Sequence, residues 1–225
     1  MTEKKAASDN SVQERGVTAK GVEAWVIEGN RRFRSDPGNI ARIEMTKSGQ
    51  HPKRAVAGCG DSRVAANNTN SASIGDQFNT QAIAAMLDNA GIAALMYPVL
   101  HLGTRVVDIE VHTGCGGIAA AIQFIKTGKL PDAEKDSILN QEVRRIASVL
   151  SATPSALDDP TAASILVGSE VAKRFAGCSS EIREMAKSGE LGINVWLYDI
   201  KTGEKHVVGR VAYDGRSDSF VVVRV

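Results

Sequence analysis

The sequence predicts an α/β fold with a central, mostly parallel β-sheet flanked by helices. Two short, apolar and partly β-branched segments, 54–58 and 105–111, have the composition of strands. A segment with helical periodicity lies between them and another follows the second, the order in which parallel strands are joined by crossover helices. With 225 residues and 43% hydrophobic content, the chain can bury a sizeable core as one domain.

The amino-terminal part divides into an arm and a helix. Residues 1–19 are polar and have neither the apolar core of a secretory signal nor the pattern of a transit peptide, so they predict a flexible arm. Residues 20–225 are then expected to form a single domain. Val22, Trp25, Val26 and Phe33 recur near helical spacing, which predicts a helix over 20–34 that SDPG ends.

The next segments predict the first half of the sheet. A buried strand over 54–58 ends at Cys59, and a short strand is expected over 77–81. The pattern over 91–103 is helical, although Pro98 should kink this helix or mark its first turn. After the strand at 105–111 comes HTGCGG, and then a helix that stops at Gly128.

The carboxyl-terminal half predicts two helices followed by three strands. Residues 138–150 and 160–177 have amphipathic helical patterns. Alternating or β-branched segments at 193–200, 205–213 and 219–225 predict strands that complete one edge of the sheet.

Charge and cysteine content exclude several classes of partner. The net charge is +1, with 27 basic and 26 acidic residues, so neither nucleic acid nor an anionic membrane is an expected partner. No apolar run reaches the roughly 18 residues of a membrane helix. Three cysteines, an odd number in a chain of this length, favour a reducing, cytoplasmic location.

Chemistry-bearing residues follow two of the predicted strands. Cys59 and Asp61 follow the first, and His112 and Cys115 follow the strand at 105–111, so the carboxyl ends of parallel strands would bring them together. Two thiolates and one imidazole with an exchangeable fourth position are typical of a catalytic zinc site. A bidentate pair with Arg63 would orient the Asp61 carboxylate. If that pair breaks, Asp61 could instead become the fourth ligand and close the site.

Two motifs in this order resemble those of the β-class carbonic anhydrases. Cys59-Gly-Asp61-Ser-Arg63 and His112-Thr-Gly-Cys115 look like the CxDxR and HxxC motifs of that family, and the similarity extends over roughly residues 20–212. The resemblance implies one zinc ion per subunit, held by Cys59, His112 and Cys115. It also implies reversible hydration of carbon dioxide to bicarbonate and a proton, by a zinc-bound hydroxide that the Asp61–Arg63 pair orients.

The resemblance has further implications for assembly. It implies a homodimer or a homotetramer in which the amino-terminal helical arm packs on the partner subunit. Gln50 would then reach the substrate pocket of a neighbouring subunit.

Two other functions are compatible with the same ligands. One is hydrolysis of carbonyl sulfide or carbon disulfide at the zinc site, and the other is a catalytically altered, zinc-stabilised assembly or binding protein. The chain departs from the usual family pattern at Asn79–Ile83, where an arginine is replaced by Gln81. It also departs at Asp108 and Glu110, two carboxylates on an inner strand that are costly unless paired.

Overall fold

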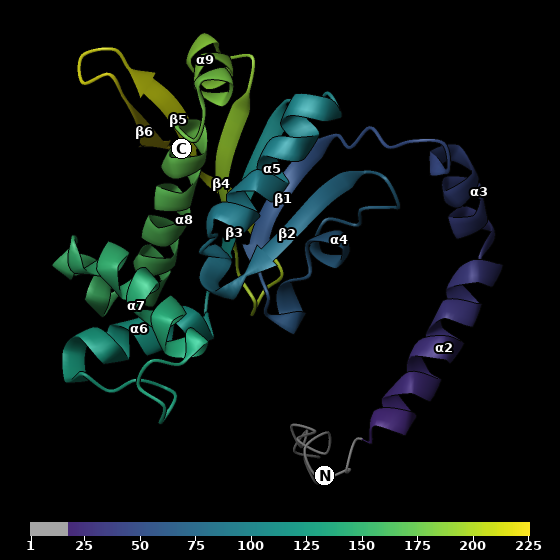
Figure 1. The fold of residues 1–225 in the computed structure, drawn as a ribbon, viewed down its shortest axis with the longest axis horizontal. Helices are drawn as coiled ribbons and strands as arrows, with labels where there is room; N and C mark the ends of the chain where they lie inside the picture. The colour runs from purple at the N-terminus through teal and green to yellow at the C-terminus, as the bar shows by residue number, and fades with distance from the viewer. Residues whose placement is uncertain (1–17) are drawn as a thin grey trace, which may run out of the picture. The chain divides into compact units, whose positions relative to one another are not determined.

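The computed structural model describes residues 18–225, which divide into two units, one that ends at Ser48 and one over Gly49–Val225 (Figure 1). Almost all of the expected arm, residues 1–19, lies outside the described residues. The flexible arm and the single domain over 20–225 therefore stay predictions.

The first unit contains two helices, α2 (Ala19–Ser35) and α3 (Pro37–Thr46). The predicted helix over 20–34 is confirmed, but the SDPG segment also begins a second helix that the sequence interpretation missed. The Asp36 side chain accepts a hydrogen bond from the backbone N–H of Asn39 at 2.9 Å, and Pro37 occupies the first turn. The large apolar side chains that the two helices leave exposed are Val22, Trp25, Val26, Ile27, Phe33, Ile40, Ile43 and Met45.

The second unit is built on a six-stranded mixed sheet in the order β2-β1-β3-β4-β5-β6. The strands are β1 (Arg54–Cys59), β2 (Gln77–Ala82), β3 (Val106–His112), β4 (Gly192–Tyr198), β5 (Lys205–Asp214) and β6 (Ser219–Arg224). The four strands from β2 to β4 run parallel, whereas β5 and β6 are antiparallel to their neighbours. All six strands were predicted, and the mostly parallel sheet is confirmed.

The second unit also contains six α-helices. They are α4 (Ala66–Thr69), α5 (Asn89–His101), α6 (Gly116–Thr127), α7 (Ile138–Ser151), α8 (Pro160–Ala176) and α9 (Ser180–Ser188), with short 3-10 turns at Ser62–Val64, Ile83–Ala85 and Pro154–Asp158. Pro98 lies in the last turns of α5, so its placement in a first turn was wrong. Helix α9, which Ser179 caps, was not predicted.

The two faces of β3 have different surroundings. Val107, Ile109 and Val111 are buried in one core with apolar residues of α5, α8 and α9, and Figure 1 shows α5 and α8 over this side of the sheet. Alternation then places Asp108, Glu110 and His112 on the opposite face. A second core joins α6, α7 and the first half of α8 around Cys59 and Cys115, so the carboxyl ends of β1 and β3 are enclosed by helices.

Among residues 18–225, no helix combines the length and the apolar character that crossing a membrane requires.

Candidate metal centre

The three sulfur and nitrogen ligands come from two neighbouring strand ends. Cys59 is the last residue of β1 and His112 is the last residue of β3, and these strands pair in parallel. Cys115 follows after a tight turn in which Gly114 has φ +67°, a conformation that glycine adopts without strain. Cys115 is then the residue that immediately precedes the first turn of α6, and its side chain makes no capping hydrogen bond. The sheet order thus brings together residues more than 50 positions apart in the sequence.

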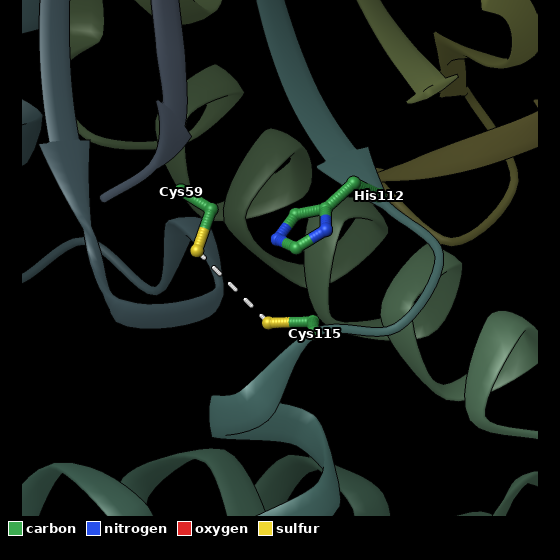
Figure 2. Close-up of side chains that lie close together, drawn as sticks. All are labelled: Cys59, His112 and Cys115. Carbon is green, nitrogen blue, oxygen red and sulfur yellow. Dashed lines mark hydrogen bonds between the residues drawn. The ribbon is translucent and has the colours of Figure 1, made fainter. Parts of the chain in front are cut away.

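The ligand atoms have the spacing that a zinc ion needs. The sulfurs of Cys59 and Cys115 are 4.0 Å apart, and they lie with a His112 ring nitrogen within 4.8 Å of one another. Two sulfurs bound tetrahedrally at about 2.3 Å from zinc would be ~3.8 Å apart. In Figure 2 both sulfurs and the His112 ring face the same small space. The three cysteines of the chain are free thiols.

The orientation of His112 leaves one nitrogen for a metal. Its Nδ1 atom lies 2.9 Å from the carbonyl oxygen of Thr113 and is therefore the protonated nitrogen that donates. Within residues 18–225, the buried Nε2 atom has no hydrogen-bond partner. A buried ring nitrogen without a hydrogen-bond partner is costly unless it has a ligand, so the ring is oriented to bind a metal ion.

The pKa values of the two thiols are shifted in opposite directions. Hydrogen bonding from the Cys115 thiol, helped by His112, lowers the pKa of Cys59 to about 4, although burial opposes this shift. The same contact, together with burial, raises the pKa of Cys115. Burial alone would lower the pKa of His112, but the Cys59 thiolate outweighs it and raises the pKa. The site thus holds one thiolate readily, and a divalent cation would replace the shared proton.

Asp61 and Arg63 form a bidentate pair beside these ligands. The Nε and Nη2 atoms of Arg63 donate to the two oxygens of Asp61 at 2.9 and 2.6 Å. The backbone N–H of Arg63 donates to the same carboxylate at 3.0 Å. Arg63 therefore holds the pKa of Asp61 well below its usual range. In this arrangement the carboxylate faces the guanidinium, and its role as a fourth metal ligand stays a prediction.

Gln50 is placed outside the triad. It is exposed in the segment between α3 and β1. Its expected role in a neighbouring subunit stays a prediction.

The two unusual carboxylates of β3 are paired, as the sequence required. Asp108 accepts hydrogen bonds from Arg54 at 2.7 Å and from Asn194 at 2.9 Å. Glu110 lies 3.2 Å from the same guanidinium and 2.5 Å from Lys205. The side chains of Asp108 and Glu110 are only 3% and 7% exposed, so this polar network replaces apolar packing on that face of the sheet.

Asn70 joins the network to the loop after β1. It donates to Glu110 at 3.2 Å and accepts from Lys205 at 2.7 Å. Sequence reasoning identified the carboxylates but none of their partners, because those come from four separate elements.

The position in β2 where the family pattern has an arginine is occupied by Gln81. Gln81 donates to the backbone carbonyl of Cys59 at 3.2 Å. A space of about 130 Å³ lies beside it, and its lining includes Val56, Asn67 and Asn79. None of its lining residues carries a charge.

The family model described as carbonic anhydrase matches residues 55–205, about two thirds of the chain. Among curated proteins, the carbonic anhydrase of Mycolicibacterium smegmatis is 31% identical over 118 residues, which cover 49% of this chain and 57% of that protein. Carbonic anhydrase 2 of Mycobacterium tuberculosis is 31% identical over 117 residues, covering 49% and 56%. The matched region therefore spans little more than half the length of these relatives.

Solved structures share the fold. The β-carbonic anhydrase CcaA superimposes with a TM-score of 0.68 at 21% identity, covering 89% of this chain and 99% of that one. A tetrameric β-carbonic anhydrase from Sordaria macrospora gives 0.64 at 21% identity, covering 84% and 95%. With the Cys59, His112 and Cys115 zinc triad in place and the family model matched across the sheet that carries it, this chain belongs to the β-class carbonic anhydrase family.

Proposed function

We propose that this protein catalyses the reversible hydration of carbon dioxide to bicarbonate and a proton. The observation that carries the proposal is the Cys59, His112 and Cys115 triad with the Asp61–Arg63 pair beside it. A zinc ion, when bound, supplies a Lewis acid that makes water nucleophilic near neutral pH.

The protein's own residues would hold and orient the reactants. The two sulfurs and His112 Nε2 hold the ion, while the Thr113 carbonyl fixes the His112 ring. Asp61 is the hydrogen-bond acceptor that would orient the attacking water, because a carboxylate keeps free lone pairs after pairing with one guanidinium. Arg63 keeps that carboxylate ionised and in one orientation.

Substrate is expected to approach from the side of Asp61. The apolar recess among Ala84, Val111, His112, Cys115, Ile118 and Ser164 has no room for a water molecule. The Asp61 side chain is 19% exposed and that of Arg63 is 55% exposed, so solvent and small molecules reach this side.

The test is stopped-flow carbon dioxide hydration, with zinc quantified in the same samples. Cys59→Ser should lose both zinc and activity, whereas Cys178→Ser, a matched change at the half-buried cysteine outside the triad, should keep both. Asp61→Asn should keep zinc and lose most of the activity. Full zinc content with no hydration above buffer would refute the proposal, and hydrogen sulfide release from carbonyl sulfide would identify the other reaction.

We further propose that the active protein is a homodimer or a homotetramer in which α2 and α3 pack on a partner subunit. Their exposed apolar side chains support this, since Trp25 is 71% and Met45 is 70% exposed in the single chain. Gln50 is proposed to complete a neighbouring subunit's substrate pocket, and its replacement by alanine should lower activity without loss of zinc. The free thiols support a reducing, cytoplasmic location.

A further inference from the structure

The connection between β2 and α5 has an unfavourable backbone conformation. Ala84 and Ala85 have φ of 55° and 56°, in the left-handed region where a side chain clashes with its own backbone. Both residues are buried, at 3% and 0% exposed. Glycine or asparagine normally occupies such positions, so two consecutive alanines persist only where the surrounding structure holds them.

This left-handed turn, Ala84–Ala85, contacts the α6 side of the zinc triad. A Cβ atom on Gly117 would lie 2.4 Å from the Ile83 side chain and 3.4 Å from Ala84 Cβ. Gly117 is two residues after Cys115, so the absence of a side chain there lets the turn lie directly on the first turn of α6. Ala84 also lines the apolar recess beside His112 and Cys115.

The residues before the turn contact the other side of the triad. Ala82 is paired with Cys59 in the β1–β2 ladder, and its carbonyl accepts from the backbone N–H of Gly60 at 3.2 Å. The turn is therefore placed between the two segments that supply the sulfurs.

Two arginines hold the end of this connection. The Leu87 carbonyl accepts from Arg145 of α7 at 2.8 Å and from Arg174 of α8 at 2.6 Å. Arg145 is also bound to Glu142, and Arg174 to Asn89, so both guanidiniums are oriented. Charged donors make stronger hydrogen bonds than neutral ones, and here two converge on one carbonyl oxygen. We call Arg145 and Arg174 the arginine clamp.

We propose that the arginine clamp is a positioning device for the zinc site. By fixing the Leu87 carbonyl, Arg145 and Arg174 keep the Ala84–Ala85 turn against Cys59 and the first turn of α6, and so keep the two sulfurs at zinc-binding distance. Without the clamp, the alanines would relax toward negative φ and the turn would move away from Gly117. This inference rests on the zinc triad and does not depend on which reaction the site performs.

The experiment measures zinc affinity of the full chain by competition with a chromophoric chelator, together with the visible spectrum of the cobalt-substituted protein. The Arg145→Gln, Arg174→Gln double variant should bind zinc at least about tenfold more weakly, the range seen when groups that orient metal ligands are removed. Its cobalt spectrum should lose intensity as the tetrahedral geometry loosens.

Arg144→Gln is the matched control, because Arg144 lies on the same helix and donates to the Lys135 carbonyl at 2.9 Å, away from the turn. It should leave zinc affinity and the cobalt spectrum unchanged. The conservative Arg145→Lys, Arg174→Lys variant should retain an intermediate affinity, and it replaces the glutamine variant if the latter does not fold.

A second pair of changes separates positioning from general stabilisation. Adding Ala84→Gly and Ala85→Gly to the variant without the clamp should restore most of the zinc affinity, because glycine holds the left-handed turn without strain. An unchanged zinc affinity without the clamp, even with a lower melting temperature, would overturn the proposal. A tenfold loss that the glycines do not restore would overturn it as well.

Discussion

Replacing Arg54 tests how the buried charges of the sheet are stabilised. Arg54→Met removes the guanidinium that bridges Asp108 and Glu110, whose side chains are 3% and 7% exposed. Breaking a buried ion pair from one side costs about 3–5 kcal/mol, because the remaining charge has no water around it. Asp108 keeps Asn194, and Glu110 keeps Lys205 and Asn70, so we expect the lower end, about 3 kcal/mol.

The assay is chemical and thermal unfolding at fixed zinc concentration, because bound metal adds to the stability of the folded state. For a chain of this size, a loss of 3 kcal/mol should lower Tm by about 6–12 °C. Lys126→Met is the control. Its ion pair with Asp158 is 47% and 85% exposed, and we expect a change of less than about 1 kcal/mol.

Neutralising both partners should reverse most of the loss. In the double variant Arg54→Met, Asp108→Asn, no unpaired carboxylate remains at that position, and the asparagine oxygen can still accept from Asn194. Two results would show that these charges do not form a mutually dependent network. One is that Arg54→Met lowers the free energy of unfolding no more than Lys126→Met does, and the other is that the double variant is as unstable as Arg54→Met alone.

Four other outcomes follow from the same contacts. Cys115→Ser should abolish stoichiometric zinc in a metal assay, and retained zinc would remove Cys115 from the ligands. Gly117→Ala should destabilise the fold by about 1–3 kcal/mol in urea unfolding, because its Cβ would meet Ile83 at 2.4 Å. The pKa of Asp61 is lowered, so its ionised form stabilises the folded state above about pH 4 and this contribution is lost in acid. The stability difference between wild type and Asp61→Asn should therefore be constant from pH 6 to 8 and vanish in strong acid; a change near pH 7 would contradict it. Trp25→Glu should give a smaller species in sedimentation, and an unchanged assembly would argue against packing through α2.

The strands and the metal ligands were predictable because their signals are local. A short apolar segment bounded by turn residues identified β1, and an alternating β-branched segment identified β3. The residue types at their ends identified Cys59, His112 and Cys115. Adjacent parallel strands then required these ends to meet. Their proximity is confirmed by the three ligand atoms lying within 4.8 Å.

The features that the sequence did not predict depend on contacts between segments that are distant in the sequence or on the backbone around them. Helix α2 ends before Asp36 and α3 begins at Pro37. The SDPG segment alone does not show whether a loop or a second helix follows the first helix. Alanine carries no signal for a left-handed backbone, so the turn at Ala84 and Ala85 was invisible in the sequence. The partners of Asp108 could not be predicted either, since Arg54 is 54 residues away and its choice of partner depends on strand order.

The separation of the two metal-binding sulfurs in the sequence makes the metal site depend on the folded sheet. Cys59 and Cys115 are 56 residues apart, and they meet only after β1 has paired with β3 and α6 has begun. A small finger domain can wrap its short chain around zinc as it folds, whereas here no local segment holds more than the His112 and Cys115 chelate. All three ligands are in place only when β1 and β3 are paired, so zinc binding and the stability of the sheet are thermodynamically linked, and whatever weakens one weakens the other.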